Sequence, residues 1–128
     1  MMWGRYLRYL WRRKNAFQIH SPFVYKLYTE VIRGKGTSGA QDVSRALAAL
    51  GIRRKVVVPL EQLLDRYLSD RDPATLFVVR GIHDDRKNEA LWDTICRHPD
   101  VILTMDLFRE GWVCYREGME KQHYVLKA

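Results

Sequence analysis

The stretch Ala-Thr-Leu-Phe-Val-Val at residues 74–79 decides the fold class. It is short, almost entirely apolar and rich in β-branched residues, which is typical of a strand buried on both faces of a sheet. A second run of this kind, Lys-Val-Val-Val-Pro-Leu, occupies residues 55–60. Pro59 weakens this second strand prediction, because proline is tolerated only at a strand end or at a sheet edge.

Helical periodicity surrounds these two strands. Ser21-Pro22 is a start signal, because serine can accept a hydrogen bond from a first-turn N–H and proline fits the first helical position. Gly51 is a stop signal of the kind that ends helices. Apolar residues at helical spacing predict five helices, over residues 3–14, 22–33, 42–50, 61–69 and 86–97.

The C-terminal part of the chain predicts further strands. Apolar and polar residues alternate over 101–107, a turn is expected at Glu110-Gly111, and residues 112–116 and 123–127 are expected to be extended. Strands separated by helices and followed by a hairpin predict an α/β sandwich. Its sheet is expected to be mainly parallel, with about four strands, and to end in an antiparallel hairpin. An N-terminal helical extension over 1–33 and a domain over 41–128 are expected to form one folding unit.

Composition excludes several classes of protein. The 128 residues are 47% hydrophobic and 29% charged, which is typical of a globular domain. No apolar run approaches the roughly 18 residues needed to span a bilayer, and arginines interrupt the N-terminus, so neither a membrane span nor a signal peptide is expected. Cys96 and Cys114 have no second cysteine nearby, which excludes zinc ribbons and CxxC motifs. A reducing, cytoplasmic location is expected.

The net charge of +7 is concentrated near the N-terminus. The first acid is Glu30, and the chain beyond the basic arm is close to neutral. Three interpretations remain open for this arm: a helix with solvated arginines, a nucleic-acid contact, or a helix on an anionic membrane surface. The candidate residues for an anionic partner are Arg5, Arg8, Arg12, Arg13 and Lys14.

A glycine pattern imitates a dinucleotide-binding loop. Gly34, Gly36 and Gly39 precede a predicted helix, and Glu61 lies 22 residues beyond the last of them. In the dinucleotide fingerprint a strand leads directly into the first glycine. Here residues 25–33 have helical periodicity, so a connecting loop is favoured over a cofactor site.

The cluster His83-Asp84-Asp85 follows the strand at 74–79, where the carboxyl ends of parallel strands form ligand crevices. These three residues are therefore candidates for catalysis or metal binding. The alternative is that Asp84 or Asp85 caps a helix that begins near Arg86. Capping is favoured, because adjacent residues rarely converge on one ion, and no metal is expected.

Two segments resemble a bacterial family of class I S-adenosylmethionine-dependent methyltransferases. The first is residues 5–33, with the box Ile-His-Ser-Pro-Phe; the second is residues 77–126, with Met-Asp-Leu-Phe, Glu-Gly-Trp-Val-Cys-Tyr-Arg and Lys-Gln-His-Tyr. Together they cover about 80 of the 128 residues. The resemblance implies a Rossmann-like three-layer sandwich, truncated in this chain, in which residues 74–79 are the fifth strand and residues 101 onward the terminal hairpin.

The chain departs from the family pattern at the cofactor site. Between Gly34 and Pro73 there is no glycine-rich cofactor loop after a first strand. Where the family has an acidic pair, this chain has Arg80-Gly81, although His83 is retained. A guanidinium there would repel both a metal ion and a sulfonium cation. The resemblance is therefore to a shortened, degenerate member.

Three functions follow as hypotheses. The first is a non-catalytic binding or assembly module without a cofactor, which pairs with a partner protein or as a homodimer through the N-terminal helices or an open sheet edge at 55–60. The second is a methyltransferase that uses S-adenosylmethionine at a site completed by a dimer or a partner. The third is nucleic-acid binding through the basic N-terminal helix.

Overall fold

The computed structural model describes residues 21–32 and 40–126. This part of the chain contains a five-stranded mixed sheet. The strand order is β1-β2-β4-β3-β5. β1 pairs with β2 and β3 with β5 in parallel, whereas β4 is antiparallel to both β2 and β3. The strands are β1 (Arg54–Val57), β2 (Thr75–Arg80), β3 (Leu103–Asp106), β4 (Glu110–Cys114) and β5 (Gln122–Val125).

The α/β class and an antiparallel hairpin, β3–β4, are confirmed, but the expectation of a mainly parallel sheet of about four strands is wrong. The sheet also ends in β5, which is parallel to β3, and not in the hairpin. Only three residues connect β3 to β4, so these strands must run antiparallel. β4 then lies between β2 and β3, which makes half of the strand pairs antiparallel. The expected turn at Glu110-Gly111 is also wrong, because both residues belong to β4. The turn precedes them, at Phe108, whose φ is +68°.

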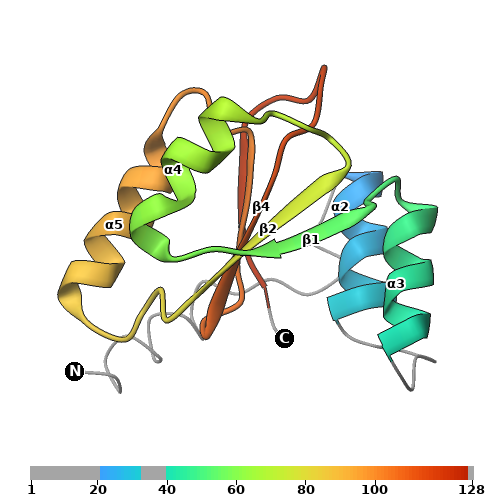
Figure 1. Cartoon of the computed structure of the whole chain (residues 1–128), viewed down its shortest axis with the longest axis horizontal. Helices are drawn as coiled ribbons and strands as arrows, with labels where there is room; N and C mark the ends of the chain where they lie inside the picture. Colours follow the sequence, from blue (N-terminus) through green and yellow to red (C-terminus); the bar gives the residue numbers. More distant parts are fainter. Residues whose placement is uncertain (1–20, 33–39, 127–128) are drawn as a thin grey trace.

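Helices cover both faces of the sheet (Figure 1). α2 and α3 lie on one face, and α4 and α5 lie on the other. The described helices are α2 (Pro22–Lys26), which continues into the π-helical segment η2 (Leu27–Ile32), then α3 (Ala40–Ala49), α4 (Leu60–Ser69) and α5 (Arg86–Arg97).

The predicted helix signals act as expected. The Ser21 side chain accepts a hydrogen bond from the Val24 N–H at 3.3 Å, and Pro22 is the first helical residue of α2. Gly51, with φ +85°, follows the end of α3. The predicted helix over 3–14 lies outside the described residues. No helix in the described ranges is long and apolar enough to cross a membrane.

The core consists of two apolar layers separated by the sheet. Alternation along β2 sends Leu76 and Val78 toward α2 and α3, whereas Phe77 and Val79 face α4 and α5. All four side chains are buried, which confirms a strand covered on both faces, although β2 begins and ends one residue later than the predicted 74–79.

β1 is an edge strand. It ends at Val57, earlier than expected from the run at 55–60, because Pro59 directly precedes α4. Its side chains are exposed except for a half-buried Val56, and Val57 is 50% exposed. Within residues 21–32 and 40–126, β1 is therefore paired on one side alone, with β2.

Candidate functional site

The β2–α5 loop carries the clearest polar cluster of the described residues. β2 ends at Arg80, and Gly81 turns the chain with φ +72°, a conformation that favours glycine. The Asn88 side chain closes the loop by donating a hydrogen bond to the Gly81 carbonyl oxygen at 2.9 Å. This geometry places His83 in the loop just before α5, which begins at Arg86.

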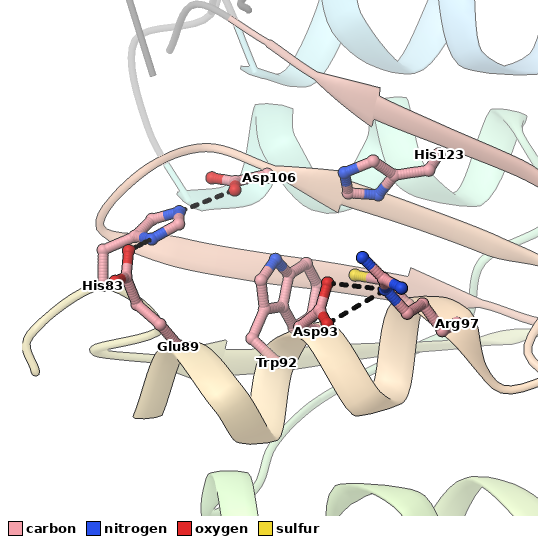
Figure 2. A pocket seen from close by; sticks show the side chains of 8 residues that line it. His83, Glu89, Trp92, Asp93, Arg97, Asp106 and His123 are labelled. Atoms are coloured by element: carbon pink, nitrogen blue, oxygen red, sulfur yellow. Dashed lines mark hydrogen bonds and ion pairs between the residues drawn. The ribbon is translucent and has the colours of Figure 1, made fainter. Parts of the chain in front are cut away.

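His83 is held between two carboxylates (Figure 2). Its Nδ1 lies 2.6 Å from Oε2 of Glu89, and its Nε2 lies 2.6 Å from Oδ2 of Asp106. The three side chains are 16%, 22% and 8% exposed, in that order. The imidazole also stacks on Phe108, with ring centroids 5.3 Å apart. The cluster therefore joins the β2–α5 loop, α5 and the end of β3.

The two carboxylates favour the doubly protonated imidazolium. Burial by itself lowers the pKa of His83, but the hydrogen bonds and charges of Asp106 and Glu89 outweigh burial and raise this pKa above its usual range. The other oxygen of Asp106, Oδ1, accepts a hydrogen bond from the Phe108 N–H at 2.8 Å. With both nitrogens donating, His83 has no lone pair for a base, a nucleophile or a metal ligand.

A cavity of about 400 Å³ lies beside this cluster. One wall is a stripe along α5 and the other is formed by β3 and β5 (Figure 2). On α5, Arg97 donates a hydrogen bond to the Asp93 carboxylate, four residues earlier, at 3.1 Å. On the opposite wall, His123 is hydrogen-bonded to Thr104 at 2.7 Å. The lining residues are His83, Glu89, Trp92, Asp93, Cys96, Arg97, Asp106 and His123.

Trp92 forms the apolar part of this wall. Its six-membered ring lies against Gly111, where an added Cβ would come within 2.5 Å of the ring. Among the described residues, the buried indole N–H of Trp92 has no hydrogen-bond partner. Burial also raises the pKa of the neighbouring Cys96 thiol to about 12, so the thiolate needed for nucleophilic chemistry is scarce at neutral pH.

The structure separates the three residues that the sequence grouped together. Asp85 is the helix cap, because its Oδ1 accepts a hydrogen bond from the Asn88 N–H at 2.8 Å. Asp84 is exposed, and only His83 joins the cluster. No group of three His, Cys, Asp or Glu residues in the described ranges could hold a metal ion.

Other predicted residues lie away from this cluster or outside the described part of the chain. Arg80 is 71% exposed, with its Nε 4.0 Å from a carboxylate oxygen of Glu110. The glycines of the loop pattern and the basic residues of the N-terminal arm lie outside the described ranges: Gly34, Gly36, Gly39, Arg5, Arg8, Arg12, Arg13 and Lys14.

Sequence reasoning missed Glu89 and Asp106. A signal for Asp106 was present, because it interrupts an apolar segment and shares a sheet face with Thr104. An acid buried at the end of a strand needs a partner, and histidine is a suitable residue type, but the sequence does not show which histidine lies within reach. Glu89 gave no such signal, since an acid in a first helical turn is ordinary.

Comparisons with known proteins add no information about this site. No family model, curated protein or solved structure matches the chain.

Proposed function

We propose that this protein is a non-catalytic assembly module that binds another β-strand along β1, at one edge of its sheet. The observation that carries the proposal is the position of β1 at the end of the sheet, paired on one side with β2. An edge strand presents backbone N–H and C=O groups that can pair with a further strand.

The backbone hydrogen bonds identify which residues face outward. The N–H groups of Arg54 and Val58 donate to carbonyl oxygens of the β2 side at 3.0 Å each. In a parallel pair, alternate residues of one strand point both backbone groups toward the neighbour. The intervening residues, Lys55 and Val57, therefore direct their N–H and C=O groups away from β2.

The two charged side chains of β1 contact other residues of the same chain. Arg54 donates hydrogen bonds to Asp70 at 2.9 Å and to Thr75. The Lys55 ammonium lies 5.6 Å from the ring centroid of Trp112, toward the centre of the sheet. Charged residues on an edge normally discourage unselective pairing. Here they leave the backbone accessible and restrict pairing to strands whose side chains suit this edge.

The proposal excludes methyl transfer, which remains the alternative implied by the resemblance to methyltransferases. Two features support the exclusion: His83 is engaged at both nitrogens, and Arg80 stands at the carboxyl end of β2, where that family has an acid. We expect no shift in a thermal melt with millimolar S-adenosylmethionine or S-adenosylhomocysteine. A ligand at 100 times its dissociation constant would add about 2.7 kcal/mol, so a clear shift would favour the enzyme.

The assembly itself is tested by the size of the native complex in cell lysates. Val57→Pro removes an outward N–H without removing a β1–β2 hydrogen bond, and Val57→Thr retains that N–H with a side chain of similar shape. We expect the wild type and Val57→Thr to elute above the monomer mass and Val57→Pro to elute as a monomer. Elution of the wild type as a monomer would overturn the proposal.

A further inference from the structure

We infer that the strand bound by β1 is the β1 of a second copy, related by a two-fold axis that passes through Val56. This inference rests on the proposed function and names its partner. A two-fold axis makes the strands antiparallel and closes the assembly at two copies. The sheets of both copies would then continue across the interface.

Backbone geometry limits the possible registers to three. In an antiparallel ladder, residues that exchange both backbone hydrogen bonds must both point outward. The outward residues of β1 are Lys55 and Val57, as derived above. A two-fold axis can therefore pass through residue 55, 56 or 57.

Side-chain chemistry favours the central register. An axis at Lys55 places two lysines directly opposite each other, and directly opposed like charges destabilise a sheet. An axis at Val57 pairs Lys55 with Pro59, which lacks an N–H and is followed at once by α4.

The axis at Val56 has neither defect. It pairs Lys55 with Val57 of the second copy twice, and it brings the two Val56 side chains together at the axis. Arg54 then faces Val58. Every cation of the strand thus lies opposite a valine, and the half-exposed Val57 gains a neighbour.

Opposite charge changes at one position test this register against the axis at Val57, in which residue 57 would face residue 57 of the second copy. In the central register residue 57 faces Lys55 of the other copy, so Val57→Glu creates two attractive pairs per dimer and Val57→Lys creates two repulsive ones. The two cross-strand pairs of a dimer together change its dissociation constant by about 2-fold to 30-fold. Sedimentation equilibrium of the purified full chain from about 1 µM to about 1 mM measures this effect.

The expected result is a dimer that Val57→Glu tightens and Val57→Lys weakens, each within that range. Ala90 is exposed on α5, away from the edge, so Ala90→Glu and Ala90→Lys are the matched controls and should leave association unchanged. Thermal melts of each variant establish that it is folded. Equal weakening by both Val57 variants would refute the Lys55–Val57 register.

The outcomes also separate this inference from the proposed function. A wild type that is monomeric at all these concentrations, while its complex in lysates remains sensitive to Val57→Pro, would overturn self-pairing and leave strand binding intact. A purified dimer that persists in Val57→Pro would overturn both.

Discussion

Replacing Asp106 by asparagine should destabilise the protein in a pH-dependent manner. The substitution keeps the shape of the side chain but removes its charge. In the wild type Asp106 is 8% exposed and accepts one hydrogen bond from His83 at 2.6 Å and another from the Phe108 N–H at 2.8 Å. The asparagine oxygen can serve only one of these donors, so its amide group must face the other.

The expected cost is that of one buried, charge-assisted hydrogen bond, about 1.5–3 kcal/mol. The sign of the pH dependence follows from the raised pKa of His83. A group whose pKa is raised by folding contributes stability that is fully present below its unfolded pKa, about 6.5, and is lost as the pH rises through the folded pKa. At high pH the neutral imidazole can accept from the asparagine amide, so the difference between the two proteins should shrink.

Urea unfolding at about pH 5.5 and about pH 9 measures both quantities. We expect Asp106→Asn to lower the free energy of unfolding by about 1.5–3 kcal/mol at the lower pH and by less at the higher pH. Asp84→Asn, in the exposed part of the same loop, is the control and should change stability by less than about 0.5 kcal/mol at either pH. A cost that is independent of pH would refute the charged cluster.

Three further substitutions or reactions test the described packing. Gly111→Ala should cost at least about 1–3 kcal/mol in urea unfolding, because its Cβ would lie 2.5 Å from the buried indole. Asp85→Ala should cost about 1 kcal/mol through loss of the helix cap, whereas Asp84→Ala should cost less than half of that, as thermal melts would show. Burial raises the pKa of both Cys96 and Cys114 to about 12, so a thiol reagent at neutral pH should label them slowly until urea unfolds the chain.

Local features were predictable from the sequence because they depend on neighbouring residues. The helix predicted at 86–97 has the bounds of α5, since its apolar stripe and its cap lie within the same twelve residues. The strand predicted at 74–79 is β2 displaced by one residue. Pro59 correctly marked the end of β1, because the loss of one N–H acts at a single position.

Features that depend on strand order were not predictable in this way. Nothing near Asp106 in the sequence shows that β4 lies between β2 and β3, yet that order brings Asp106 within reach of His83, 23 residues away. The π-helical turn η2 is another example. It replaces the end of a predicted regular helix where buried Leu27 and Tyr28 pack into the core, so tertiary packing overrides local periodicity.

The His83 cluster and the edge strand should behave as independent parts of the molecule. The cluster joins the β2–α5 loop, α5 and the end of β3. The outward backbone groups of β1 lie on the side of β1 that faces away from β2. The hydrogen bonds given above for Arg54 and for His83 share no residue. Substitutions without shared contacts usually have additive effects.

Combining Asp106→Asn with Val57→Lys should therefore give a protein whose loss of stability at low pH is that of the first substitution and whose weakened association is that of the second. Coupling between the two substitutions would mean that the protonation state of His83 affects association at β1 through the sheet.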